Sequence, residues 1–459
     1  MKIVEVTRVT PSSNSPNSAL EFSLPLTFFD IFWFKHPPVE RLFFYQLDDL
    51  TPARFNSEIV PKLKQSLSLT LLHYLPLAGN LRWPSDSPKP IILYTPNDGV
   101  SLTVAESNAD FDLLSSNGIY EAAELRPLTP ELITSDDSAS TIALQVTLFP
   151  NKGFCIGITA HHVVLDGQTT TLFFKSWAYI CKQGNIYENS PLPPNLTPFF
   201  DRSVIKDPNG VDMLYLNQWL AALGSVNSDS NNHKSLKVFP HKAEAPNLVR
   251  ATVEISREDL KRLRERILPH FSDSAKELHL STFVLTLAYL TTCIIKARGG
   301  DGAGIGFIID CRSRLNPPVP QNYFGNCNTG TLTMMKARDH LFDENGFVFA
   351  VKKVSDTVKE SLEKGVLQGI ENKLAFLFEL GMELWKSGLP IISVAGSPRF
   401  EVYGCDFGWG KPLKVVVVSL DSNAISMAES RDGSKGVEVG LALKKHEMDN
   451  FSSLFLSDV

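Results

Sequence analysis

The sequence is poor in cysteine and has no motif that places two cysteines close together. It holds 6 cysteines among 459 residues, none of them in C-x-x-C spacing and several of them inside apolar runs. This pattern argues against a disulfide-stabilised scaffold and against a cysteine-ligated metal site. We therefore expect reduced, buried thiols, no metal and a cytoplasmic protein.

An excess of positive charge and long apolar runs are also missing. The formal net charge is −6, and no basic stripe with interleaved aromatic residues occurs, which disfavours a nucleic-acid partner. The longest apolar run, Phe283 to Ile295, is broken by threonines and is too short to cross a membrane. The N-terminus lacks the basic and apolar regions of a secretory signal. We expect neither a nucleic-acid nor a membrane partner.

Several familiar catalytic motifs are absent or stand in the wrong context. The G-x-S-x-G elbow of serine hydrolases does not occur. The glycines of "GAGIG" (Gly302 to Gly306) precede an expected strand instead of following one, so they do not predict a dinucleotide loop. The "DFG" at Asp406 has no H-R-D or V-A-I-K companion, which argues against a protein kinase.

What the sequence does contain is a mixture of strand and helix patterns without strict alternation. Alternating apolar residues predict strands, and apolar residues at every third or fourth position predict helices. The expected strands cover 2–9, 41–47, 141–149, 154–160, 250–256, 305–310, 414–420, 424–430 and 437–443. The expected helices lie near 56–71, 212–224, 281–295, 347–362 and 448–455. No repeat of 20 to 50 residues is visible, so the pattern indicates an α/β protein with mixed sheets.

The chain is long enough for two domains. Its middle, residues 183–245, is rich in Pro, Ser and Asn and loses the regular patterns, which is typical of a connection between two halves. We predict a first domain over 1–190, a crossover linker over 191–245 and a second domain over 246–459.

Two adjacent histidines end the strand "FCIGITAHH" and are followed by Asp166 and Gly167. If the strand keeps its pleat, His162 shares a face with Phe154 and Ile156, and His161 points to the other face. We expect the face with the large apolar residues to be buried, so that His162 points inward at a strand end. A neutral imidazole there can remove a proton from a hydroxyl, although a hydrogen-bonded core histidine is the alternative.

The segment His162-x-x-x-Asp166-Gly167 resembles the HxxxD(G) motif of the BAHD acyltransferases, plant enzymes that use acyl-CoA thioesters. "CDFGWGKP" matches their DFGWG motif at Asp406 to Gly410, 240 residues after Asp166 as in that family. Further segments along the whole chain look like family blocks: "HYLPLAGNL", "PFFDRS", "STF", "DCRSRLNPPVPQNYFGNC" and "SVAGSPRFEVYG". The last two resemble the branch that acts on anthocyanin and flavonoid glycosides.

The resemblance implies two similar domains of chloramphenicol-acetyltransferase-like topology with a channel between them. It also implies malonyl-CoA as co-substrate, no cofactor, a sugar hydroxyl of a phenolic glucoside as acceptor, and a monomer. His162 is then the general base of a reaction through a tetrahedral intermediate. The alternatives are an acetyl- or hydroxycinnamoyl-CoA-dependent enzyme of the same family and, in a different class, a non-catalytic small-molecule binding protein.

Other motif residues receive their roles from the same resemblance. The indole N–H of Trp409 is a candidate donor to the oxyanion, with simple packing as the alternative. Asp166 and Asp406 are interpreted as structural carboxylates of the catalytic motifs, paired with Arg312 and Arg314. The alternative for Asp166 is that it orients His162 as the aspartate of a triad would. Gly167 relaxes the backbone after Asp166.

The donor needs contacts for its phosphates and for the malonyl carboxylate. Ser281 and Thr282 begin an expected helix, where free N–H groups favour an anion, although ordinary capping is the alternative. Arg399 in "GSPRF" is the first choice for the carboxylate, with Lys175 and His36 as further candidates. Ser397 belongs to the same donor-binding segment.

Overall fold

The N-terminal half of the computed structural model is organised around a mixed sheet. The structure describes residues 1–12, 16–184, 191–207, 209–224, 234–239, 246–271, 278–336 and 345–455. The strand order of this sheet is β1 (Lys2–Val9), β6 (Val100–Glu106), β9 (Ile142–Phe149), β10 (Gly153–Ala160), β3 (Val39–Gln46) and β15 (Lys414–Val417). All neighbouring strands are antiparallel except β6 and β9. The hairpin β9–β10 confirms the sequence expectation for 141–160.

A second mixed sheet organises the C-terminal half. Its strand order is β13 (Asn328–Lys336), β12 (Gly302–Asp310), β14 (Ile391–Gly396), β16 (Ala424–Glu429), β17 (Val437–Lys444), β11 (Leu248–Ile255) and β7 (Tyr120–Glu121). Strand β14 runs parallel to both of its neighbours, and the other pairs are antiparallel. A smaller antiparallel sheet joins β2 (Phe22–Pro25), β5 (Ile91–Tyr94), β4 (Asn80–Arg82) and β8 (Ser138–Ser140).

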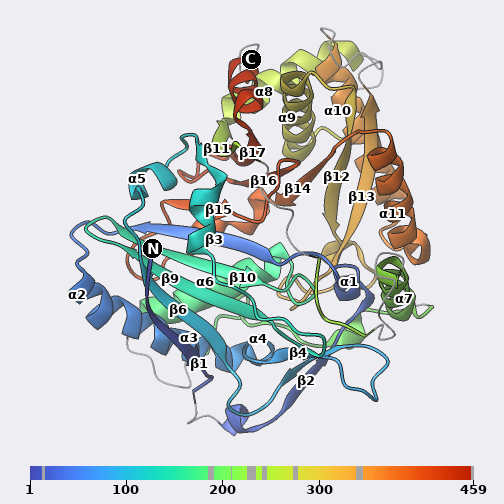
Figure 1. Cartoon of the computed structure of the whole chain (residues 1–459). Helices are drawn as coiled ribbons and strands as arrows, with labels where there is room; N and C mark the ends of the chain where they lie inside the picture. Colours follow the sequence, from blue (N-terminus) through green and yellow to red (C-terminus); the bar gives the residue numbers. More distant parts are fainter. Residues whose placement is uncertain are drawn as a thin grey trace.

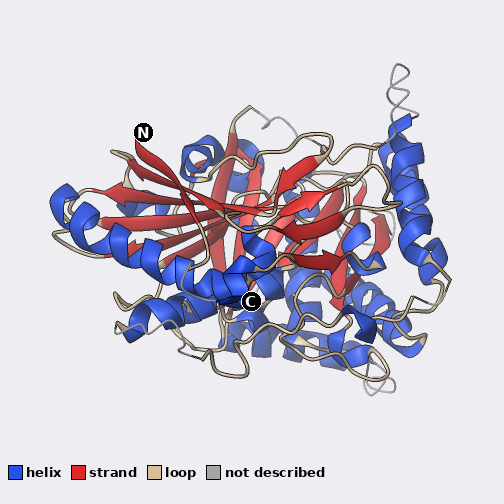
Figure 2. Ribbon diagram, turned by 90° about the horizontal axis from the view of Figure 1, so that it is seen from below, coloured by secondary structure: helices blue, strands red, loops and turns tan. Residues whose placement is uncertain are grey.

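Helices pack against the central strands of the two larger sheets, whereas the edge strand β1 is largely exposed (Figures 1 and 2). The longer helices are α3 (Val60–His73), α6 (Gly167–Gln183), α7 (Val211–Gly224), α8 (Arg257–Ile267), α9 (Thr282–Arg298), α10 (Gly346–Glu363), α11 (Ile370–Lys386) and α12 (Lys445–Leu454). The shorter ones are α1 (Phe28–Ile31), α2 (Pro52–Arg54), α4 (Leu75–Ala78) and α5 (Phe111–Leu114). Helices α7, α9, α10 and α12 agree with the helices expected from the sequence.

Each of the two larger sheets takes one strand from the other half of the chain. Strand β15 follows the DFGWG segment in sequence, yet it pairs with β3 of the N-terminal sheet. Strand β7 comes from the N-terminal half and pairs with β11 of the C-terminal sheet. A division of the chain at residues 190 and 246 therefore separates strands that pair with each other. The predicted domain boundaries stay a prediction.

The position of α6 is fixed by aromatic packing on the N-terminal sheet. Every residue of β9 and β10 is buried, as expected for central strands that are covered on both faces. Phe174 of α6 stacks on Phe43 of β3, with ring centroids 4.2 Å apart. Trp177, one turn later, has an exposed fraction of 0% and donates its indole N–H to Ser66 of α3 at 3.0 Å. This packing holds the β10–α6 turn, which carries both histidines, in one place.

Candidate active site

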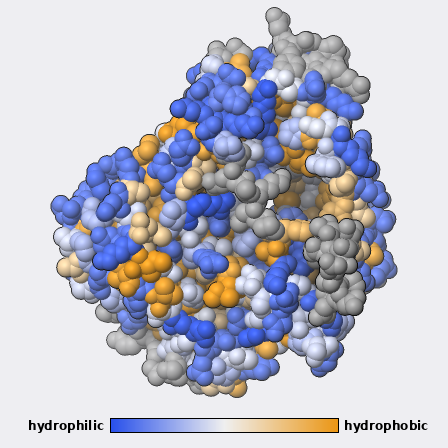
Figure 3. Space-filling model, viewed as in Figure 1, coloured by the Kyte–Doolittle hydropathy of each residue, from blue (hydrophilic) through white to orange (hydrophobic). Residues whose placement is uncertain are grey.

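A cavity of about 2550 Å³ lies between the two halves of the molecule. Its wall combines residues of β3, α6 and the β10–α6 turn with residues of β12, β13, α9 and the segment that follows β14. The surface drawn in Figure 3 is hollowed where the two halves meet. His162 is part of the wall and so is accessible to a molecule bound between the halves.

The turn between β10 and α6 places His162 at the cavity. Strand β10 ends at Ala160, and the N–H of His161 donates to the carbonyl of Thr141 at 2.9 Å. Helix α6 then begins with Asp166 as its N-cap, whose carboxylate accepts from the N–H of Thr169 at 2.8 Å. A strand end and a capped helix therefore fix both sides of the six-residue turn, and His162 sits on a rigid support.

The surroundings of the two histidines differ, but not in the way that the alternation of side chains along the strand predicted. His161 is the more buried residue, with an exposed fraction of 0%, and its Nδ1 accepts from the N–H of Val163 at 3.3 Å. His161 does not contribute to the described cavity wall, whereas His162 does. The expectation that one face of β10 is buried and the other points outward is wrong, because both faces of the strand are buried. Contact with the cavity, rather than burial, distinguishes His162.

The His162 ring is held by an aromatic partner. It stacks on the indole of Trp33 with ring centroids 4.0 Å apart and an interplanar angle of 1°. The indole N–H of Trp33 donates to Oδ1 of Asn328, at the start of β13, at 3.0 Å. Asn326 donates its side-chain N–H to the carbonyl of His162 at 3.0 Å. Residues far apart in sequence thus orient the imidazole, and no local pattern around Trp33 or Asn328 indicated this role.

Burial lowers the pKa of His162 to about 4, although Asp166 acts in the opposite direction. The imidazole is therefore neutral at pH 7 and has the protonation state of a general base. Among the described residues, no carboxylate forms a hydrogen bond or ion pair with its ring. The arrangement accordingly differs from a Ser-His-Asp triad, in which a carboxylate orients the histidine.

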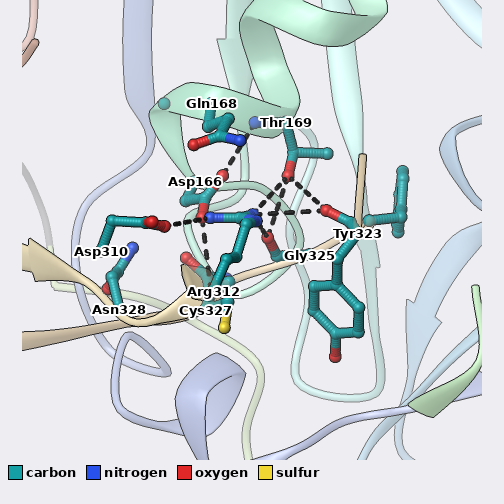
Figure 4. A network of polar contacts seen from close by, with 12 residues as sticks. Asp166, Gln168, Thr169, Asp310, Arg312, Tyr323, Gly325, Cys327 and Asn328 are labelled. Carbon is teal, nitrogen blue, oxygen red and sulfur yellow. Dashed lines mark hydrogen bonds and ion pairs between the residues drawn. The ribbon is translucent and has the colours of Figure 1, made fainter. Parts of the chain in front are cut away.

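The carboxylate of Asp166 points toward Arg312 (Figure 4). It does not orient His162 as the aspartate of a triad would. Its Oδ2 lies 2.8 Å from Nη2 of Arg312, and the two side chains are 5% and 1% exposed. Arg312 also contacts the carboxylate of Asp310 at 2.7 Å and donates to the carbonyl of Gly325 at 3.1 Å. The Cys327 N–H donates to Oδ2 of Asp166 at 3.3 Å. This network ties the β10–α6 turn to the segment between β12 and β13, as the expected Asp166–Arg312 pair requires.

Asp406 does not have the arginine partner that was expected. Its carboxylate pairs with Lys182 at the end of α6 at 2.6 Å and accepts from the N–H groups of Gly408 and Gly410 at 2.8 and 3.0 Å. Arg314 instead donates to the backbone carbonyl of Asp310 at 2.7 Å. The error arose because Arg312 and Arg314 form a short 3-10 turn and do not share one face of an extended strand. The Asp406–Lys182 pair ties the DFGWG segment to the end of α6.

Trp409 lies far from His162, so its predicted role as oxyanion donor is wrong. Its ring packs edge-on against Phe154 at 5.7 Å and lies beneath the ammonium of Lys62 at 4.8 Å. Phe154 is near the start of β10, and Ala160 lies six positions further along the strand, which is about 20 Å at 3.3 Å per residue. Trp409 is not part of the described cavity wall. The alternative interpretation, that Trp409 packs, agrees with these contacts.

The residues predicted to bind the donor do share one surface. All of them line the cavity: His36, Lys175, Ser281, Thr282, Ser397 and Arg399. Ser281 is the N-cap of α9, and its hydroxyl accepts from the N–H of Val284 at 3.3 Å. The hydroxyl of Ser397 accepts from the N–H of Arg399 at 3.2 Å, and Arg399 is exposed at the cavity rim.

Two of the three cations proposed for the malonyl carboxylate are disfavoured. Burial lowers the pKa of His36 to about 3, so this side chain is neutral at pH 7 and supplies no positive charge. Lys175 already pairs with Glu401 at 3.0 Å. Arg399 forms no ion pair with another described residue and stays a candidate.

Gly167 has a steric role next to the histidine. A Cβ atom added there would lie 2.7 Å from the ring of Phe400, which is closer than side chains approach. Glycine at this position therefore lets the segment after β14 pack directly on the first turn of α6.

The part of the chain that the structure describes contains no cluster of His, Cys, Asp and Glu suited to a metal ion. All six cysteines are buried and free, as the sequence indicated. No described helix is both long enough and apolar enough to cross a membrane.

Comparison with known proteins places this geometry in context. Residues 1–457 match the model of the Transferase family. The chain is 51% identical to phenolic glucoside malonyltransferase 1 of Arabidopsis thaliana, over 98% of this chain and 96% of the relative. It is 46% identical to an anthocyanidin 5-O-glucoside-6''-O-malonyltransferase of the same plant, covering 99% and 97%. The crystal structure of vinorine synthase has a similar fold, with a TM-score of 0.67 at 22% identity, covering 100% and 98%.

Proposed function

The chain belongs to the Transferase family, the BAHD acyltransferases, and from this we propose that it transfers a malonyl group from malonyl-CoA to a sugar hydroxyl of phenolic or flavonoid glucosides. One observation carries the proposal: His162, neutral and rigidly held, lines a cavity built from both halves of a chain that resembles malonyltransferases over its full length. A cavity of this size can hold a CoA thioester and a glycoside together.

In the proposed reaction His162 acts as general base without a covalent enzyme intermediate. Its neutral nitrogen accepts the proton of the sugar hydroxyl while the hydroxyl oxygen attacks the thioester carbonyl carbon. The tetrahedral intermediate then breaks its C–S bond, and the departing CoA sulfur takes the proton back from the imidazolium. Stacking on Trp33 keeps the imidazole in position during both transfers, and such positioned proton transfer contributes roughly 10²- to 10⁴-fold in rate.

We assign the CoA end of the donor to the cavity region around Ser281, Thr282, Ser397 and Arg399. Helix α9 has 17 residues, and its N-terminal N–H groups and dipole favour a phosphate. Arg399 is exposed at the rim, where a guanidinium can meet a phosphate that is still partly in water. The roles of Asp166, Gly167 and Arg312 are structural in this proposal.

The low pKa of His162 predicts an unusual acid limit for activity. Since the proton must be absent for catalysis, kcat/KM should stay nearly constant from neutral pH down to about 5 and fall around the pKa of about 4. The pH profile of kcat/KM, with intrinsic fluorescence recorded at each pH to monitor unfolding, tests this. An acid limb near the ordinary histidine value of about 6.5 in a folded enzyme would contradict the burial of the base.

The proposed function is tested by an acyl-CoA panel. The purified protein is incubated with a phenyl β-glucoside and malonyl-, acetyl- or p-coumaroyl-CoA, and the products are identified by mass. We expect the malonyl ester to form fastest. Preferential acetyl or coumaroyl transfer would overturn the malonyl assignment and keep the acyltransferase. Binding of glucoside and CoA without any turnover would instead favour the non-catalytic binding protein.

A further inference from the structure

Arg41 is a buried cation in the cavity wall that sequence reasoning did not select. It lies on β3 with an exposed fraction of 4% and lines the cavity. Its Nη1 donates to the hydroxyl of Thr171, in the second turn of α6, at 3.1 Å. Among the described residues, no carboxylate lies within ion-pair distance of its guanidinium.

Other buried arginines of this protein are compensated. Arg312 pairs with two carboxylates, and Arg202 pairs with Asp30 at 3.5 Å and donates to the carbonyl of Phe324 at 2.8 Å. Arg250 donates to backbone carbonyls, one of them that of Val417 at 3.0 Å. A buried charge without a partner is costly, so a protein retains one where a ligand supplies the opposite charge. Arg41 is the buried arginine of the cavity wall with room for such a ligand.

One described carboxylate, that of Glu429, acts on Arg41 electrostatically without forming an ion pair with it. Glu429 also lines the cavity, and its Oε1 accepts from the N–H of Tyr403 at 2.9 Å. Its Oε2 is buried without a partner, and burial raises the pKa of this carboxyl, which favours its neutral form. Burial lowers the pKa of Arg41 only to about 10, so the side chain is a cation at pH 7. The positive charge is therefore present in the cavity wall.

Arg41 and His162 approach the cavity from the same edge of the N-terminal sheet. In the antiparallel pair β3–β10, Ala160 faces Val39, and Arg41 faces Ile158. Arg41 is thus two residues inside β3 from the edge where β10 ends and His162 follows. It lies on the same sheet face as Ile158 and Ala160, because paired residues of neighbouring strands share a face. A group bound to Arg41 is consequently near the catalytic end of the cavity, not at its rim.

We propose that Arg41 binds the free carboxylate of the malonyl group and so selects a dicarboxylic acyl donor. This inference rests on the proposed function and names a specificity residue for it. A deep, poorly hydrated guanidinium distinguishes a charged acyl group from a neutral one more strongly than the exposed Arg399 can, since water weakens charge interactions at the rim. Arg399 is left to the CoA end of the donor.

The test compares Arg41→Gln with Arg399→Gln as the matched control. For each variant and the wild type, kcat/KM is measured with malonyl-CoA and with acetyl-CoA, and a phenyl β-glucoside is the acceptor. In Arg41→Gln the malonyl-to-acetyl ratio should fall by on the order of a hundredfold, since removing one partner of a buried charged pair weakens binding strongly. In Arg399→Gln both donors should weaken by the same factor, which leaves the ratio unchanged.

Two milder variants keep the test valid if Arg41→Gln does not fold, as shown by its melting temperature. Arg41→Lys keeps the charge without the planar fork, and Thr171→Val removes the hydroxyl that holds the guanidinium. Both should lower the ratio by a smaller factor.

An unchanged ratio in folded Arg41 variants of an enzyme that uses malonyl-CoA refutes the role of Arg41 and leaves the proposed function intact. A selective loss in Arg399→Gln instead assigns the carboxylate to Arg399. A wild type that prefers acetyl-CoA refutes both proposals.

Discussion

Replacing His162 with asparagine is expected to lower kcat by roughly 10²- to 10⁴-fold, because the variant loses the group that removes the acceptor proton. Asparagine keeps a polar side chain against Trp33 but cannot accept a proton at neutral pH. The fold should survive, since the imidazole has no carboxylate partner among the described residues and its removal leaves no charge stranded. Steady-state kinetics with malonyl-CoA and the melting temperature of the same preparation test both statements.

His161→Asn is the matched control for this experiment. An asparagine Oδ1 can replace Nδ1 as the acceptor for the N–H of Val163, so folding should be retained. Since His161 does not line the described cavity, kcat should stay close to that of the wild type. Equal loss of activity in both variants, or full activity in His162→Asn, would refute the assignment of the base.

The second large expected effect is on the free energy of unfolding, when Arg312 is replaced. Arg312→Ala should lower the free energy of unfolding by about 3–5 kcal/mol, because it leaves the buried carboxylate of Asp166 without its counterion. The carbonyls of Tyr323 and Gly325 also lose a donor. The midpoint of urea unfolding and the yield of soluble protein measure this loss.

The neighbouring Arg314 supplies the control, since it is exposed and donates to one backbone carbonyl. Arg314→Ala should change the free energy of unfolding by no more than about 0.5 kcal/mol. If Arg312→Ala is as stable as the wild type and yet inactive, the arginine acts on the substrate, and the structural interpretation of the Asp166–Arg312 pair is wrong.

Local patterns predicted the elements that depend on local sequence. The hairpin β9–β10 follows from two largely apolar runs on both sides of the short turn 150–152, and α9 follows from an apolar run capped by Ser281. The HxxxD and DFGWG motifs, with their spacing, led to the correct family. In each case the determining residues are close together in the sequence or belong to a recognised motif.

Predictions failed where a distant partner determines the outcome. Asp406 pairs with Lys182, 224 residues earlier, and the sequence around either residue does not predict the contact. Trp409 belongs to a conspicuous motif, but the pairing of β15 with β3 carries that motif to the end of β10 opposite His162. The orientation of His162 depends on Trp33, which precedes it by more than a hundred residues.

The exchange of strand β15 constrains how the chain can fold as it leaves the ribosome. Synthesis proceeds from the N-terminus, so β3 is complete more than 360 residues before its edge partner Lys414–Val417 exists. Until then the hydrogen-bonding edge of β3 is open, and open edges pair readily with other chains. A polypeptide that stops before residue 414 therefore exposes an unpaired strand edge on its N-terminal sheet. Premature termination or proteolysis in the C-terminal half yields an aggregation-prone fragment, not an independently folded N-terminal unit.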